Sequence, residues 1–253
     1  VDLAQVADPE TSRQILLKKE SLADKTGGDS ILTLYLTLDL DKTYFSEKSN
    51  PHLFYTPERR GLNNKNPDRL VPEIYDRATR RFIEDRPAII NWLRAYLELT
   101  TYEISCPVLR DAQLAPAGQT GLIISTLMDY QLVRHVADAG WYDAFKATAA
   151  EIIVNILDAT IYPGFKEKII DSFVSTPLTL ARITGNSDGA ITGWAFTNKP
   201  IPAVSSLAKV ARSIETPIPD VLQAGQWVFS PSGLPISILT GKLAADAVNK
   251  QLR

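Results

Sequence analysis

The sequence is poor in the residues that disulfides and metal sites require. It contains one cysteine, Cys106, and two histidines, His52 and His135, among 253 residues. A single cysteine excludes an intrachain disulfide and a four-cysteine zinc site. Neither histidine has a cysteine or carboxylate at ligand spacing, so we expect no metal site and interpret both as ordinary surface or half-buried residues.

Long apolar runs and strong charge are also absent. No run of about 18 apolar residues occurs, so no membrane-spanning helix is expected. The N-terminal sequence "VDLAQVADPETSRQ" lacks the basic and then apolar pattern of a signal peptide. The net charge of −2 gives no general attraction to nucleic acid. We expect a globular protein in a cytoplasmic, reducing setting, with no nucleic-acid partner.

Three motifs of nucleotide binding and hydrolysis are missing as well. The chain has no G-x-x-x-x-G-K-[ST] loop, no G-x-G-x-x-G fingerprint and no G-x-S-x-G nucleophile elbow. Asp129 and Tyr130 could take part in proton transfer, but nothing in the sequence singles them out. We therefore name no catalytic residue.

The clearest periodicity is in "ILTLYLTLDL", residues 31–40, where leucines alternate with mostly polar residues. This period of two predicts a strand with a buried leucine face. Further strands are expected at 52–56, 101–109, 120–127, 166–176, 190–196 and 221–229. Helices are expected at 9–25, 141–161 and 234–251, and at 73–98, where Pro87 marks a break or a new first turn.

Strands and helices follow one another without strict alternation, which favours an α+β fold: a mixed β-sheet with packed helices. The stretch "GLNNKNPDR", 61–69, is expected to be a loop. A Pro-rich stretch near 197–219 predicts a boundary between a first domain, 1–196, and a second domain, 197–253.

The segment 69–94 is rich in arginine, with acidic residues interleaved. A mixed, solvated helix face is the simplest interpretation. The alternative is contact with a membrane surface, which would matter for a lipid substrate.

Two stretches are not explained by periodicity. In "STPLTLARITGNSDGAITGW", 175–194, Pro177 suits a first helical turn, and three later glycines interrupt a loop that ends on Trp194. In "QAGQWVFSPSGLPISILTGKLAADAV", 223–248, a strand and a turn lead into a helix. A helix start offers free N–H groups and a positive dipole end to an anion or a polarised carbonyl. A plain strand–turn–helix packing unit is the alternative.

These stretches resemble a known family. The segment 216–245, "TPIPDVLQAGQWVFSPSGLPISILTGKLAA", resembles the C-terminal flavin motif of the phytoene desaturase, carotenoid isomerase and retinol saturase group, within the amine-oxidase-like FAD oxidoreductases. The segments 176–194 and 109–126 resemble earlier stretches of the same group. The resemblance covers roughly residues 100–250 well and the first hundred residues only in general pattern.

The resemblance implies that this chain is the C-terminal half of a longer flavoprotein. Family members hold FAD first through an N-terminal βαβ unit with a G-x-G-x-x-G fingerprint, which is missing here. The chain would then contain a substrate-binding-type domain, 1–196, and the C-terminal part of an FAD-binding domain, 197–253, which ends in its terminal strand–turn–helix. The whole protein would move a hydride between an extended apolar substrate, of polyene or isoprenoid type, and flavin. The chain alone is expected to be inactive and to bind FAD weakly or not at all.

The resemblance also implies roles for particular residues. Gly225 would pass close to the ribityl–phosphate arm, and Gln226 stands where many relatives carry an acidic residue that bonds the cofactor. The residues expected to bring helix-start N–H groups beneath the isoalloxazine are Gly233, Leu234, Pro235 and Ile236. Those expected to line the flavin or substrate side are Gly189, Gly193 and Trp194.

Two other functions remain open at this point. One is a non-catalytic module whose apolar cavity holds a lipid or a partner helix. The other is an amine-oxidase-type flavoenzyme, for which we find no convincing lysine and aromatic cage. An exposed half-site would also favour self-association through an apolar patch.

Overall fold

The computed structural model describes residues 6–61, 73–76, 78–79 and 81–252. The chain forms two compact units. The central unit comprises Ile31–Thr179, and the terminal unit combines Val1–Ser30 with Leu180–Arg253. The boundary expected near 197–219 therefore falls inside the terminal unit, because the N-terminal segment packs with the C-terminal third of the chain.

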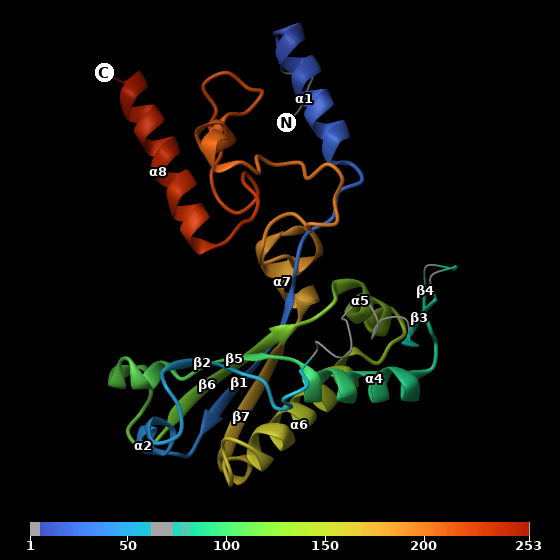
Figure 1. The fold of residues 1–253 in the computed structure, drawn as a ribbon, viewed down its shortest axis with the longest axis vertical. Helices are drawn as coiled ribbons and strands as arrows, with labels where there is room; N and C mark the ends of the chain where they lie inside the picture. The colour runs from blue at the N-terminus through green and yellow to red at the C-terminus, as the bar shows by residue number, and fades with distance from the viewer. Residues whose placement is uncertain (1–5, 62–72, 77, 80, 253) are drawn as a thin grey trace. The chain divides into compact units, whose positions relative to one another are not determined.

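A five-stranded sheet in the order β2-β5-β6-β1-β7 forms the centre of the central unit (Figure 1). Its strands are β1 (Ile31–Leu38), β2 (His52–Tyr55), β5 (Tyr102–Ser105), β6 (Thr120–Leu127) and β7 (Ile169–Ser175). Every pair of neighbouring strands in it is antiparallel. The α+β class is confirmed, but the expected mixed sheet is wrong. The helical connection from β6 to β7 skips one position in the sheet, and β1 fills that position with the opposite direction.

Helices cover one face of this sheet, with α4 and α6 packed against each other (Figure 1). The helical elements of the unit are α2 (Lys42–Ser46), α4 (Arg86–Leu99), η4 (Pro107–Leu109), η5 (Ala112–Leu114), α5 (Tyr130–Asp138), α6 (Tyr142–Ala159) and η6 (Lys166–Lys168).

Helix α4 begins later than its sequence suggested. Asp85 caps it by accepting the N–H of Ala88 at 3.0 Å, and Pro87 lies in the first turn. The residues before it form a short antiparallel pair, β3 (Tyr75–Asp76) with β4 (Arg81–Phe82). The expectation of helix from residue 73 is therefore wrong, whereas the expectation that Pro87 marks a new first turn is confirmed.

The leucine face predicted for 31–40 is confirmed. Leu32, Leu34 and Leu38 of β1 are 0% exposed. They belong to a buried cluster with apolar residues of α4 and α6, such as Leu93 and Ile153. The opposite face of the sheet is left more open: Tyr35 on β1 contacts Phe173 on β7, with ring centroids 6.0 Å apart.

The terminal unit consists of helices joined by long irregular segments (Figure 1). Its elements are α1 (Pro9–Leu22), the last residues of α7 (Pro177–Thr184), η7 (Ser187–Gly189), η8 (Leu207–Ile214) and α8 (Leu234–Gln251). The predicted final helix is confirmed. The strands expected at 190–196 and 221–229 are wrong, because the described residues there form only isolated bridges. Gly193 (φ +74°) and Gly225 (φ +105°) break both stretches.

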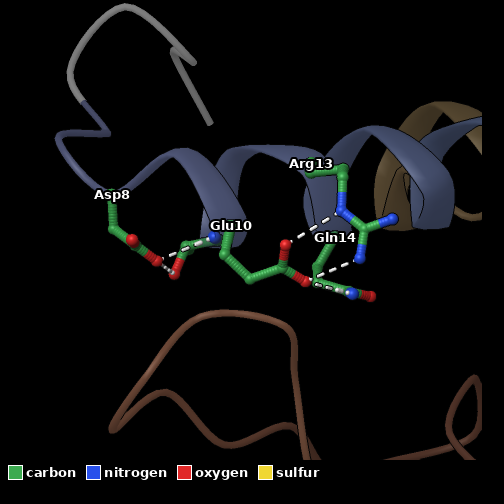
Figure 2. A network of polar contacts seen from close by, with 5 residues as sticks. Asp8, Glu10, Arg13 and Gln14 are labelled. Atoms are coloured by element: carbon green, nitrogen blue, oxygen red, sulfur yellow. Dashed lines mark hydrogen bonds and ion pairs between the residues drawn. The ribbon is translucent and has the colours of Figure 1, made fainter.

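A polar network fixes the start of α1 (Figure 2). Asp8 accepts the N–H and the hydroxyl of Thr11 at 2.8 and 2.6 Å, which caps the helix. One turn later Arg13 and Gln14 both donate to Glu10. These hydrogen bonds lower the pKa of Glu10 to about 2, and the bond from Arg13 has the largest effect.

Among the described residues, no helix is both long enough and apolar enough to cross a bilayer. The loop expected at 61–69 lies outside the described residues except for Gly61, and so do Arg69, Arg77 and Arg80 of the arginine-rich segment.

Candidate cofactor site

The loop that carries Gly189, Gly193 and Trp194 lies against the N-terminal segment 26–30. Three backbone hydrogen bonds join them: Gly28 N–H to Gly193 O (2.7 Å), Ile191 N–H to Asp29 O (2.8 Å) and Ala195 N–H to Thr26 O (3.1 Å). The approach is so close that a Cβ on Gly27 would lie 2.2 Å from the carbonyl oxygen of Ser187. A glycine at this position is therefore required by packing within the protein.

The same loop also contacts the segment that follows Gly225. The indole N–H of Trp194 donates to the carbonyl of Trp227 at 2.9 Å, and their rings meet edge to face with centroids 4.8 Å apart. The side-chain amide of Gln226 donates to the carbonyl of Ala190 at 3.2 Å. Two stretches that are more than thirty residues apart in the sequence, and that were both assigned to the candidate site, therefore form one local structure.

Gly189 and Gly193 are held by protein atoms. Gly189 is buried, and its carbonyl accepts the hydroxyl of Ser30 at 2.7 Å. A Cβ on Gly193 would lie 2.2 Å from the carbonyl oxygen of Gln226, and its φ of +74° also favours glycine. Neither glycine needs a ligand to explain it, and their role on the flavin or substrate side stays a prediction.

Gly225 and Gly233 differ from these two. Their φ values are +105° and +155°, yet a Cβ on Gly225 would meet nothing within 4 Å. A Cβ on Gly233 would meet only the Cδ of Pro235, at 3.9 Å. Both positions have a backbone that favours glycine and also have open space beside it.

The residues from Gly225 to Gly233 are called the open segment below, and α8 starts at its end. Gly233 is its N-cap and provides no side-chain cap, Pro235 lies in the first turn, and that turn contains no acidic residue. Leu234 is 75% exposed, Pro235 is exposed and Ile236 is half-buried. The helix therefore presents an uncapped, positively polarised end to its surroundings.

Thr240 ties the open segment to the helix. Its side chain is 0% exposed, accepts the N–H of Gly225 at 3.0 Å and donates to the carbonyl of Ile236 at 2.9 Å. Beside this arrangement, Ser232 Oγ is buried without a hydrogen-bond partner in the part of the chain that the structure describes. An orphaned hydroxyl next to an uncapped helix end suits a polar ligand atom.

Sequence reasoning missed a cavity of ≈530 Å³ in the terminal unit. Trp194 and Trp227 form part of its wall, together with Lys18 from α1 and Arg212 from η8. Only Trp194 had been assigned to a site. The other residues come from four separate segments without a shared motif, so no sequence signal could have joined them.

A second hollow, of ≈470 Å³, lies in the central unit near α5. His135 lies on its wall and makes a hydrogen bond through Nε2 to the carbonyl of Ile83 at 3.0 Å, consistent with an ordinary half-buried histidine. Asp129, also on the wall, caps α5 by accepting the N–H of Leu132 at 2.7 Å. A structural role accounts for both residues.

The described residues include no group of three or more His, Cys, Asp or Glu side chains that could hold a metal ion. Burial raises the pKa of the Cys106 thiol to about 11, so this thiol is protonated and unreactive at neutral pH.

Searches against known proteins give no further assignment. No protein-family model matches the chain, and no curated protein matches it.

Proposed function

We propose that this chain supplies one wall of an FAD site in an oxidoreductase that moves a hydride between an extended apolar substrate, of polyene or isoprenoid type, and flavin. The proposal starts from the sequence resemblance of the segments 176–194 and 216–245. The remaining half of the flavin site would come from an upstream dinucleotide-binding unit of the same protein.

One structural observation carries the proposal further: the open backbone at Gly225 and Gly233. Glycines with positive φ whose missing Cβ would meet no protein atom closely allow a flat or charged ligand to approach the main chain. The orphaned hydroxyl of Ser232 lies beside them. These features fit a bound cofactor, whereas Gly27 and Gly193 are fully explained by protein contacts.

The uncapped start of α8 gives this chain its chemical role in the proposal. Its first-turn N–H groups and dipole would stabilise negative charge on a ligand carbonyl placed there. The hydride chemistry would come from the bound flavin, and the protein would supply orientation and electrostatics. Gln226 Nε2 donates one hydrogen bond to Ala190 O, so its second N–H and its Oε1 would be left to bond the cofactor.

Several apolar side chains of α8 are exposed, and in the proposal they are covered by the rest of the flavin domain. Leu234, Ile238 and Val248 are 75%, 64% and 43% exposed, and Thr240 is the only buried residue of this 18-residue helix. Without that cover we expect the chain to self-associate. A cytoplasmic setting with peripheral membrane contact would suit an apolar substrate.

The test is an FAD titration of the purified chain, repeated on a longer product that includes the upstream coding region, with binding followed by flavin fluorescence. We expect tight binding only by the longer product. In it, Gly225→Val should weaken binding by at least about tenfold, since the new side chain occupies the ligand's space. Gly185→Val is the matched control, because Gly185 has φ +71° and open space but lies outside the candidate site.

Two results would contradict the proposal. Absence of FAD binding by the longer product would remove the flavin assignment altogether. Equal effects of Gly225→Val and Gly185→Val would mean that the open segment does not contact the cofactor.

A non-catalytic binding module is the second candidate, and the cavity of ≈530 Å³ favours it. Its volume lies within the range of small-molecule sites. This second candidate would be supported if the longer product failed to bind FAD and the cavity bound another ligand.

A further inference from the structure

We infer that the cavity of the terminal unit is a binding site for a small amphipathic anion, with an apolar body and one carboxylate or phosphate head group. This inference does not depend on the flavin proposal, because its charged residues and its aliphatic wall are not among the expected cofactor contacts; Trp194 alone belongs both to the cavity and to the expected flavin or substrate side.

About half of the cavity wall is apolar. Its aliphatic part comes from segment 201–204, Ile-Pro-Ala-Val, together with Val228 and Leu22 of α1. Trp194 and Trp227 add their indole rings, which meet at an interplanar angle of 77°. Because both indole N–H groups already donate, to Trp227 O and to Asn186 Oδ1, the rings offer the cavity mainly apolar surface. An apolar ligand body suits this wall.

Three charged side chains lie on the same wall: Lys18, Arg212 and Glu215. The ammonium of Lys18 donates to the carbonyl of Pro202 at 3.2 Å, which holds it beside the aliphatic segment. Within the described chain, Arg212 makes no ion pair or hydrogen bond through its side chain, and neither does Glu215. The guanidinium is therefore available to bind a carboxylate or phosphate.

The balance of charge favours an anion. Two cations face one carboxylate, and none of the three charges is neutralised by a salt bridge in the described chain. The carboxylate of Glu215 repels an anionic ligand and lowers its affinity. Removing this charge should therefore strengthen anion binding, which tests the sign of the ligand's charge. A guanidinium, an ammonium and an apolar wall together match a ligand whose polar end is a single anionic group.

The experiment is calorimetric titration of the 253-residue chain with three probes that share one chain length, below their micelle concentrations. The probes are decanoate, decan-1-ol and decyltrimethylammonium, and inorganic phosphate is titrated separately. We expect saturable binding of decanoate, roughly fivefold weaker binding of decan-1-ol, and still weaker binding of decyltrimethylammonium.

Substitutions of the charged residues test which of them contacts the anionic head group of the ligand. Arg212→Gln should weaken decanoate binding roughly fivefold and leave decan-1-ol unchanged, because only the charge contact is lost. Glu215→Gln should strengthen decanoate binding. Lys209→Gln is the matched control on the same element, η8, since Lys209 is exposed and does not line the cavity. Circular dichroism confirms that each variant is folded.

Four results would overturn the inference. These are no binding of any probe, equal binding of all three chain probes, an unchanged decanoate affinity in Arg212→Gln, and saturation by phosphate at the affinity of decanoate. The last would mean a bare anion site without an apolar component. None of these results involves flavin, so they leave the FAD proposal untouched.

Discussion

The interactions that stabilise the central unit differ from those that stabilise the terminal unit. Every member of the large buried cluster lies between Leu32 and Phe165, in the central unit. In the terminal unit, the buried apolar residues among those described are Ala190, Ile214, Val228 and Phe229. That unit relies instead on backbone and indole hydrogen bonds and on glycines at points of close approach. The stability of the central unit should therefore be most sensitive to substitutions that shorten a buried side chain. The stability of the terminal unit should be most sensitive to substitutions that add a side chain at a glycine.

The largest effect is expected in the central unit. Leu34→Ala removes a side chain that is 0% exposed in the middle of β1, so it should lower the free energy of unfolding by about 3 to 4 kcal/mol. Urea denaturation followed by far-UV circular dichroism measures the change. Tyr35→Ala is the control on the opposite face, where Tyr35 is 40% exposed, with an expected loss of about 1 kcal/mol or less. Similar losses for the two variants would refute the assignment of the buried face.

Added volume should affect the terminal unit next most strongly. Gly193→Ala places a Cβ against the Gln226 carbonyl, so it should destabilise this unit by about 2 to 3 kcal/mol. Gly185→Ala, with almost the same φ but open space, should cost only about 1 kcal/mol. Hydrogen exchange of the amides in 186–198 gives both values. If Gly185→Ala proved as costly, backbone conformation alone would explain the effect.

A smaller effect is expected from the indole contact. Trp194→Phe removes the hydrogen bond to Trp227 O and should destabilise the terminal unit by about 1 kcal/mol. Hydrogen exchange of the amides in 186–198 measures this loss of stability as well. Trp141→Phe changes an indole in the central unit, so faster exchange of 186–198 in that variant would show that the two units do not respond separately.

The smallest effect concerns pH. Burial raises the pKa of Cys106 from 9.0 to about 11, so the folded central unit favours the neutral thiol. The thiol then contributes stability below pH 9, and this contribution falls as the pH rises from 9 to 11, because only the unfolded chain ionises readily there. Denaturation midpoints for the native chain and Cys106→Ser should converge over this interval. A constant difference between them would contradict the pKa shift.

The same contrast explains how much the sequence could predict. The alternating leucines of 31–40 and the helix at 234–251 follow from periodicity, and both are confirmed. The antiparallel order of the sheet could not be predicted, because it depends on β1 pairing with strands some 90 and 140 residues later.

The terminal unit was harder to predict because its contacts have no period. Gly193 and Gly225 end the expected strands, and segment 26–30 pairs with residues 189–195, which are distant in the sequence. The structure brings the candidate residues near 190 and 226 into contact through hydrogen bonds of Trp194 and Gln226. The cavity was missed because Lys18 and Arg212 meet there only after folding.

The most direct test of the proposed flavin site is hydrogen exchange of the longer product with and without FAD. The account predicts that FAD protects the amides of Gly225, Gly233, Leu234 and Ile236, while the amides of β1 in the central unit exchange at unchanged rates. Protection elsewhere, with exchange at 225–236 unaffected by FAD, would contradict the account.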